Sequence, residues 1–227
     1  MNVERNLIIA ILKLTRNGPV SHELINKEAN IPLQICRKLL LKLQNDGFVY
    51  VNEAFVEADG TQRLKLAVKA LSLGADIETV SAFLRWQEFE EIAATVLERN
   101  GYSVAKNIHF NHAGRKWEID VVGCRKPLAL CMDCKHWHRA ISPSALKAIV
   151  EEQTQRTWAF AETLPKLTNK VECAMWDSVR VVPAVLSLIA GKFKFYDSVP
   201  IVPVLQLQDF LSQLPAYVDS LRHFTKP

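Results

Sequence analysis

Two aspartates and one lysine stand in a single apolar stretch of the chain, Trp117–His138. Apolar runs on either side of Gly123–Pro127 predict two short strands joined by a turn. Because side chains alternate along a strand, Asp133 and Lys135 are expected on one face, where Asp120 can meet them if the strands pair. A buried charge is costly unless it is paired or bound to a metal. This spacing therefore indicates a chemical site within the hairpin.

The chemistry that suits these residue types is phosphodiester hydrolysis. Strict alternation places Glu118 and Val122 on the same face as Asp120. Two carboxylates at close range repel each other, and Mg²⁺ relieves this by taking carboxylates, waters and phosphate oxygens as ligands. Lys135 cannot bind a metal while it is protonated, but it can orient a water nucleophile or stabilise charge on a phosphate. The alternative is a surface hairpin with one Asp–Lys pair and an unrelated aspartate.

The order of motifs resembles the PD-(D/E)XK nuclease superfamily, above all the branch of type IV restriction endonucleases and archaeal Holliday-junction resolvases. In that family a helix with a Phe-Glu pair precedes a leucine, a Gly-Tyr-x-Val segment, a strand aspartate and a (D/E)-x-Lys strand. The resemblance covers about residues 84–227, although Ile119 stands where the family name has proline. The matching residues are Phe89-Glu90, Leu97, Gly101-Tyr102-Ser103-Val104, Asp120 and Asp133-x-Lys135.

The resemblance implies a metal-dependent DNA endonuclease that uses Mg²⁺, for which Mn²⁺ can substitute. It implies Asp120 and Asp133 as metal ligands and Lys135 as the catalytic lysine. Glu90 would reach the metal directly or through water, and its alternative is a solvated acid. Gln153 resembles the active-site glutamine that some branches carry on the following helix. A hydrogen bond from Gln153 to nearby backbone is the alternative.

The expected partner is DNA, duplex or branched, in repair, recombination or restriction. Many members of the family are dimers because each chain cuts one strand, so a homodimer and a repair or helicase partner are both compatible with the resemblance. Arg115 and Lys116 in a polar turn, and Arg156 on a helix, are available for phosphate contacts. The alternative function is a winged-helix DNA-binding or docking protein with a catalytically silent nuclease-like domain.

Composition is that of an ordinary globular protein. The chain has 227 residues, 49% hydrophobic and 23% charged residues, and a net charge of +4. This mildly basic balance permits a local nucleic-acid patch without demanding one. No apolar run reaches membrane-spanning length, and the N-terminus lacks the features of a signal peptide. The sequence therefore predicts a cytoplasmic location.

The cysteines allow a competing interpretation. Cys131 and Cys134 form a C-x-x-C motif followed by His136 and His138, which would suit a zinc knuckle in an interaction protein. On a strand, however, residues three apart face opposite sides, so these two thiols share a metal only in a turn. The chain has five cysteines, and in a reducing compartment disulfides are not expected.

The N-terminal part resembles a winged helix-turn-helix. Helical periodicity predicts helices over residues 2–16, 21–29 and 33–45, and a strand pair follows over 48–57. In that fold the third helix lies in the DNA major groove. Ile35 is expected on its inward face. The alternative is that its exposed charges only solvate the helix and that the module binds protein. Its expected outward, DNA-contacting residues are Gln34, Arg37, Lys38 and Lys42.

The expected domains are a winged helix over 1–59, a helical connector over 60–83 and a restriction-endonuclease-like domain over 84–227. Arg63 is expected to add basic charge to the connector. The last domain has the pattern α-β-β-β-α-β-β-α, which predicts an α+β or α/β fold with a mixed sheet flanked by helices. Ser142 with Pro143 predicts a helix start. Pro183 places the strand over 180–189 at a sheet edge or a strand start.

Overall fold

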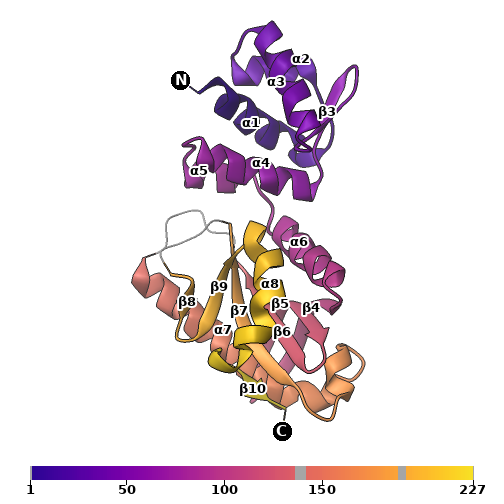
Figure 1. Ribbon diagram of the computed structural model, residues 1–227, viewed down its shortest axis with the longest axis vertical. Helices are drawn as coiled ribbons and strands as arrows, with labels where there is room; N and C mark the ends of the chain where they lie inside the picture. Colours follow the sequence, from indigo (N-terminus) through magenta and orange to yellow (C-terminus); the bar gives the residue numbers. More distant parts are fainter. Residues whose placement is uncertain (1, 136–141, 189–192, 227) are drawn as a thin grey trace. The chain divides into compact units, whose positions relative to one another are not determined.

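The structure is a computed structural model that describes residues 2–135, 142–188 and 193–226 (Figure 1). The chain forms two compact units. The first is Met1–Glu88, and the second begins at Phe89. The boundary falls within the first turn of helix α6 (Trp86–Arg99). Among the described residues, no helix is both long and apolar enough to cross a membrane.

The first unit begins with three helices and a small sheet. Three short strands form an antiparallel sheet in the order β1-β3-β2, in which Val56 pairs with both Val20 and Val51. The Ser21 side chain accepts a hydrogen bond from the backbone of Leu24 and so caps the second helix, as the sequence predicts. The elements are α1 (Val3–Leu14), β1 (Val20–Ser21), α2 (His22–Ala29), α3 (Leu33–Asn45), β2 (Tyr50–Val51) and β3 (Phe55–Glu57).

Helix α3 buries a narrower stripe than its sequence predicts. Cys36, Leu40 and Leu43 are its buried residues. Ile35, expected to face inward, is 43% exposed. It lies one turn from Leu39, which is itself only partly buried, so both lie at the margin of the stripe.

Residues 60–83 belong to the first compact unit. They form α4 (Gly60–Ser72) and α5 (Ile77–Ala82), and α4 packs along α1. Leu64 and Ala67 of α4 are fully buried. Arg63 is 3% exposed, and it donates a hydrogen bond of 2.8 Å to the carbonyl of Leu12 at the end of α1. The helices expected as a connector therefore contribute to the core of this unit.

The second unit is a mixed seven-stranded sheet with helices packed against it. The strand order is β4-β5-β6-β7-β9-β8, and β10 pairs with β7. β4, β5 and β6 are antiparallel, whereas β6-β7 and β7-β9 are parallel, which confirms the predicted mixed sheet. After α6 come β4 (Ser103–His112), β5 (Arg115–Arg125), β6 (Leu128–Cys134), α7 (Pro143–Thr163), β7 (Arg180–Ser187), β8 (Phe195–Tyr196), β9 (Val199–Pro203), α8 (Leu207–Tyr217) and β10 (Phe224–Thr225).

Helix α7 lies across the sheet and contacts β4, β5 and β7 (Figure 1). Ser142 caps it and Pro143 opens it, as predicted. Beneath it Phe160 packs edge-to-face on Phe110, with 5.7 Å between the ring centroids. Cys131 of β6 is fully buried in the same cluster. This packing fixes α7 over the strands that carry the candidate site.

Gly123 is part of a strand and not of the predicted turn. Strand β5 continues to Arg125, so the turn lies beyond Gly123. A Cβ atom at Gly123 would stand 2.8 Å from Cδ2 of Leu97 on α6. The glycine therefore leaves room for the Leu97 side chain, where α6 packs directly on the strand.

Pro183 lies in an interior strand, which corrects the predicted edge position. β7 runs between β6 and β9. On the side away from β6, the pairing with β10 ends at Val181 and the pairing with β9 begins at Val185. Pro183 occupies the gap between these two ladders, where its missing N–H costs no sheet hydrogen bond.

Candidate active site

Strands β5 and β6 bring the two aspartates opposite each other. Their ladder pairs Val122 with Cys131 and Val121 with Met132. One step further along this register are Asp120 and Asp133. The backbone N–H of Cys134 donates a hydrogen bond of 2.7 Å to Oδ2 of Asp120. The two carboxylates therefore come from adjacent strands, as alternation along the hairpin predicts.

Side chains do not alternate strictly between Glu118 and Val122. The expectation that Glu118, Asp120 and Val122 all share one face of the strand is therefore wrong. Ile119 and Val122 belong to the same core cluster, although strict alternation would separate them. The β4–β5 ladder skips the position where Asn107 would face Asp120. Asn107 has a φ of +53°, a conformation that asparagine tolerates better than most residues. Asp120 thus lies at a local break in the pleat.

Asp133 is the centre of a buried ion cluster. It is 2% exposed, and its Oδ1 lies 2.7 Å from Nη1 of Arg156. Its Oδ2 lies 3.2 Å from Nζ of Lys135. Arg156 also reaches Glu152, with 3.3 Å between Nη2 and Oε1. Two cations thus compensate the burial of one carboxylate.

A pocket of about 200 Å³ opens at this cluster. It is lined by four acids and four bases around one tryptophan. The three basic residues expected to contact phosphate therefore line the same pocket as Asp120, Asp133 and Lys135. The acids are Glu118, Asp120, Asp133 and Glu152, and the other lining residues are Arg115, Lys116, Trp117, Lys135 and Arg156.

Burial and repulsion between neighbouring carboxylates favour the protonated forms of Asp120 and Glu90. Burial is the main cause that raises the pKa of Asp120, and the charge of Asp133 adds to it, while the N–H of Cys134 opposes it. Glu90 of α6 is 5% exposed. Burial raises the pKa of Glu90 to about 7, and the charges of Asp120 and Glu118 act in the same direction. Glu90 is not among the lining residues of the pocket, but its carboxyl responds to the acids that line it.

Gln153 reaches the site strand from α7. It is 1% exposed, and its Nε2 donates a hydrogen bond of 2.8 Å to the carbonyl of Cys131. This is the backbone bond that the sequence left open as an alternative role. Its Oε1 is buried and has no hydrogen-bond partner among the described residues. Gln153 therefore holds the strand two residues before Asp133 and retains one unused acceptor.

The donor set suits a hard cation held by few protein ligands. Within the described part of the chain, no group of three or more His, Cys, Asp or Glu side chains is placed to hold one metal ion. Asp120 and Asp133 offer two carboxylates from adjacent strands. Mg²⁺ is commonly held by one or two carboxylates, with waters and phosphate oxygens completing its shell. The pair therefore fits such an ion, and a three-carboxylate set including Glu90 is not assembled.

The zinc interpretation gains no support from the cysteines. Cys131 and Cys134 are free thiols, both within strand β6. Burial raises the pKa of the Cys131 and Cys134 thiols, which disfavours the thiolates that zinc binds. His136 and His138 lie outside the described residues.

The residues expected to contact DNA in the N-terminal part belong to the first unit. All four are exposed on α3. Lys42 lies near Glu4 of α1, with 3.3 Å between its Nζ and Oε1. The four residues are Gln34, Arg37, Lys38 and Lys42.

The sequence did not reveal that Arg156 pairs with Asp133. Arg156 was expected only as a phosphate contact. The available signal was helical spacing, because Arg156 follows Gln153 by three residues and so shares its face of α7. Glu152 and Trp117, which also line the pocket, had no signal in the pattern.

The chain resembles known proteins in the region that carries this site. Residues 81–161 match the family model described as "Restriction endonuclease". An uncharacterized protein of Archaeoglobus fulgidus is 31% identical over 136 residues, which is 60% of this chain and 95% of that protein. Residues 81–161 therefore form a restriction-endonuclease-like domain. No solved structure matches the chain. The restriction-endonuclease-like domain holds the hairpin of Asp120, Asp133 and Lys135 within the matched residues.

Proposed function

We propose that this protein is a metal-dependent DNA endonuclease that hydrolyses phosphodiester bonds. The observation that carries the proposal is the meeting of Asp120 and Asp133 with Lys135 in one polar pocket. The match to the restriction endonuclease family model also supports a nuclease, because it covers the strands of this pocket.

Asp120 and Asp133 would hold Mg²⁺, and Mn²⁺ would substitute for it. Glu90 would act on this ion through a water molecule, since its carboxyl is buried and does not line the pocket. When bound, the ion supplies charge neutralisation at the phosphate and a polarised water. The electrostatics fit this role, because a cation would favour the charged forms of Glu90 and Asp120, whose pKa values burial raises.

The remaining side chains would act on the water and the phosphate. Lys135 would donate hydrogen bonds to the attacking water or to a non-bridging oxygen. Arg156 would stabilise the phosphate charge from the opposite side of Asp133. Arg115 and Lys116 would hold the neighbouring DNA backbone. Gln153 is a positioning residue, because it bonds the backbone of β6 and not the reacting atoms.

We propose residues 1–59 as a winged helix that brings the DNA. Its support is the element order α1-β1-α2-α3-β2-β3 with a three-stranded antiparallel sheet. In this interpretation α3 enters the major groove and the β2–β3 hairpin forms the wing. Residues 60–83 would act as a helical connector to the nuclease domain at 84–227. The contacting side chains would be Gln34, Arg37, Lys38 and Lys42.

The proposed setting is DNA repair, recombination or restriction in the cytoplasm. A homodimer would cut both strands of a duplex, one per chain, and a helicase or another repair protein is a further proposed partner. The alternative function is a DNA-binding or docking protein with a silent nuclease-like domain. Its supporting observation is the contact of Asp133 with two cations, which compensate its negative charge without a metal.

The test is cleavage of labelled linear, nicked, flapped, four-way and single-stranded DNA with Mg²⁺ or Mn²⁺. The parent protein is expected to cut, and Asp133→Ala, Asp120→Ala and Lys135→Ala are expected to lose cutting while they keep DNA binding. Salt-dependent DNA binding by the parent without cleavage of any substrate would support the docking protein instead. Equal cutting by the parent and all three variants would exclude this site.

A further inference from the structure

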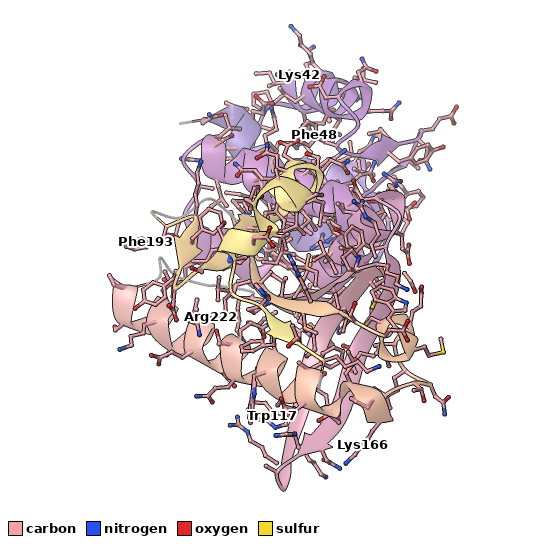
Figure 2. The ribbon with its side chains drawn as sticks, turned by 60° about the horizontal axis from the view of Figure 1, so that its bottom comes forward. Lys42, Phe48, Trp117, Lys166, Phe193 and Arg222 are labelled. Carbon is pink, nitrogen blue, oxygen red and sulfur yellow. The ribbon has the colours of Figure 1, made fainter. Side chains whose placement is uncertain are left out.

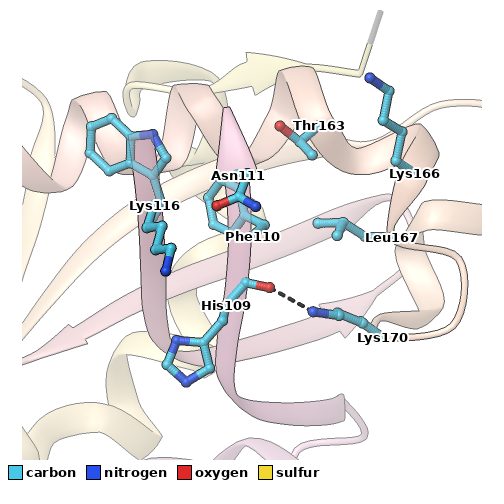
Figure 3. Close-up of a pocket in the computed structure, with 9 residues that line it drawn as sticks. His109, Phe110, Asn111, Lys116, Thr163, Lys166, Leu167 and Lys170 are labelled. Carbon is cyan, nitrogen blue, oxygen red and sulfur yellow. Dashed lines mark hydrogen bonds between the residues drawn. The ribbon is translucent and has the colours of Figure 1, made fainter. Parts of the chain in front are cut away.

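A second pocket of about 660 Å³ lies beside the candidate active site, in the same unit of the chain. It is formed by the end of the β4–β5 hairpin and the segment that follows α7 (Figure 3). Lys116 stands on the hairpin side, and Lys166 and Lys170 stand on the other side. Phe110 and Leu167 contribute an apolar floor.

The charge of this pocket is of one sign. No aspartate or glutamate occurs among the described residues that line it, whereas three lysines do. The active-site pocket, by contrast, has four acids among its lining residues. A concave surface with cations and no carboxylates concentrates anions. Phosphate is the anion that a polynucleotide would present to it.

The donors of this pocket are largely unused. Nζ of Lys170 donates a hydrogen bond of 2.6 Å to the carbonyl of His109 (Figure 3). Lys116 and Lys166 are exposed and have no ion-pair partner within the described ranges. Nε1 of Trp117 is buried and lacks a hydrogen-bond partner among the residues that the structure describes. Two cations therefore remain available to a ligand, whereas the indole N–H lies inside the fold.

The two pockets are neighbours. Lys116 and Trp117 line both of them. Figure 2 shows Trp117 and Lys166 at the same end of the second unit. On the active-site side, the guanidinium of Arg115 lies 3.8 Å from the centroid of the Trp117 ring. A DNA strand bound with its scissile phosphate at Asp133 can therefore extend past Lys116 into the second pocket.

We propose that this pocket binds one unpaired nucleotide of the substrate strand, on the same side of the domain as the scissile phosphate. The inference rests on the proposed nuclease function and adds a substrate class to it. The phosphate would contact Lys116 and Lys166, and the nucleoside would rest on Phe110 and Leu167. The volume lies within the roughly 300–1,000 Å³ that is typical of small-molecule sites.

The unpaired state follows from shape. Phosphates of a stacked duplex lie on a convex surface and reach only the rim of a concave pocket. A paired nucleotide must leave its stack to enter such a pocket, whereas an unpaired nucleotide has no stacking or pairing to lose. Single-stranded overhangs and flaps beside the cut are therefore the expected substrates.

The test is DNA binding by fluorescence anisotropy in EDTA, which separates binding from cleavage. The probes are a blunt duplex and the same duplex with a single-stranded overhang at either end. Two variants of the pocket are used, Lys166→Glu and the milder Lys166→Gln. The control is Lys126→Glu, which makes the same charge change as Lys166→Glu but lies at the end of β5 far from Lys116. Lys126 is exposed and lies roughly 30 Å along the strand from Lys116.

The parent is expected to bind an overhang at least tenfold more tightly than the blunt duplex. Lys166→Glu is expected to lose about tenfold on the overhang, and Lys166→Gln less, with circular dichroism showing that both fold. Lys126→Glu is expected to change either affinity by less than about twofold. Equal affinity of the parent for both probes, or equal losses in Lys166→Glu and Lys126→Glu, would overturn the proposal.

Cleavage by the parent and Asp133→Ala is measured separately with Mg²⁺. If the protein cleaves DNA without preferring overhangs, and Lys166→Glu has no effect, the proposed nucleotide site is refuted and the proposed nuclease function stands. If overhang binding depends on Lys166 but no cleavage follows, the proposed nucleotide site is supported and the proposed nuclease function is refuted.

Discussion

Two buried ion clusters, one in each unit, differ in how completely their atoms are bonded. In the first unit, Arg63 and Glu88 pair with 2.6 Å between Nε and Oε1, and their side chains are 3% and 8% exposed. Arg63 also donates to the carbonyls of Leu12 and Phe83 and to the hydroxyl of Thr15. Each of the three guanidinium nitrogens thus donates a hydrogen bond to the protein, as a stable buried charge requires.

The cluster in the second unit is incomplete. Asp133 contacts Arg156 and Lys135, but Oε1 of Gln153 and Oγ1 of Thr157 are buried without hydrogen-bond partners among the described residues. A buried polar atom without a partner costs stability unless something binds it. A fully bonded cluster has no capacity for a ligand, whereas an incomplete one does. The contrast fits a structural role for the first cluster and supports the proposal that the second is a site.

The largest expected effect is on the cleavage rate, in a variant of the incomplete cluster. Asp133→Asn should reduce the cleavage rate on the order of 10³-fold, because it removes a charged oxygen ligand from the site. Glu88→Gln is the matched carboxylate-to-amide change in the complete cluster, and it should leave the rate per folded molecule within about twofold. The rates are measured with Mg²⁺, and the folded fraction by circular dichroism. Cleavage by Asp133→Asn at the parent rate would show that the charge of Asp133 is not needed for the reaction.

The next effect concerns stability and should belong to the complete cluster. Arg63→Met leaves Glu88 buried without its cation, so it should lower the free energy of unfolding of the first unit by about 3–5 kcal/mol. Arg37→Met, on the exposed face of α3, should change it by less than about 0.5 kcal/mol. Urea unfolding followed by circular dichroism measures both. A loss below about 1 kcal/mol in Arg63→Met would mean that the cluster does not stabilise the unit.

The sequence predicted the hairpin well because its signal is local. Asp133 and Lys135 are two residues apart, and a strand places such residues together without help from the rest of the fold. The partners of the ion clusters are distant in sequence: Glu88 comes 25 positions after Arg63, and Arg156 comes 23 positions after Asp133. A basic residue on an amphipathic helix predicts a surface charge, and only tertiary packing reveals that it is buried.

Two other features of the site had no local signal. The positive φ of Asn107 breaks the pleat opposite Asp120, and an asparagine between Lys106 and Ile108 in a strand does not predict this. The burial of Glu90 depends on how α6 packs on the sheet, because α6 carries several glutamates near its start. The motif therefore identified the residues, whereas their electrostatics required the structure.

The electrostatic difference between the clusters should appear as a pH dependence. The pKa of Glu90 is raised from 4.5 to about 7, with burial as the main cause and Asp120 and Glu118 adding to it. The folded state therefore binds more protons than the unfolded state between these values, so the free energy of unfolding should fall as pH rises through this window. Glu90→Gln removes this penalty and should raise the metal-free stability by about 3 kcal/mol at pH 8.

Urea unfolding of the second unit in EDTA at pH 4 and pH 8 measures this effect. The advantage of Glu90→Gln should disappear at pH 4, where the carboxyl is protonated in both states. Glu88→Gln should instead destabilise the first unit at pH 8, because it weakens a fully bonded pair. Stability losses in both variants at pH 8 would show that Glu90 is as well compensated as Glu88.

The smallest expected effect compares one buried hydroxyl from each cluster. Thr15 is 3% exposed, donates to the carbonyl of Ile11 and accepts from Arg63. Thr157 is fully buried, and its hydroxyl has no hydrogen-bond partner in the described ranges. Replacing a threonine by valine keeps the shape and removes the hydroxyl. Thr15→Val should therefore cost about 1–2 kcal/mol, whereas Thr157→Val should be neutral or stabilise by up to about 1 kcal/mol.

Urea unfolding of each unit at pH 7 gives both values, and the two substitutions act as controls for each other. Both are β-branched residues in helical segments, so backbone propensity changes little and the hydrogen bonds decide the sign. Thr157→Val should also leave DNA binding in EDTA unchanged, since the hydroxyl is inside the fold. A larger loss in Thr157→Val than in Thr15→Val would mean that the hydroxyl of Thr157 is bonded in solution. Oε1 of Gln153 would then be the remaining evidence from these two residues that the cluster at Asp133 is less completely bonded than the one at Arg63.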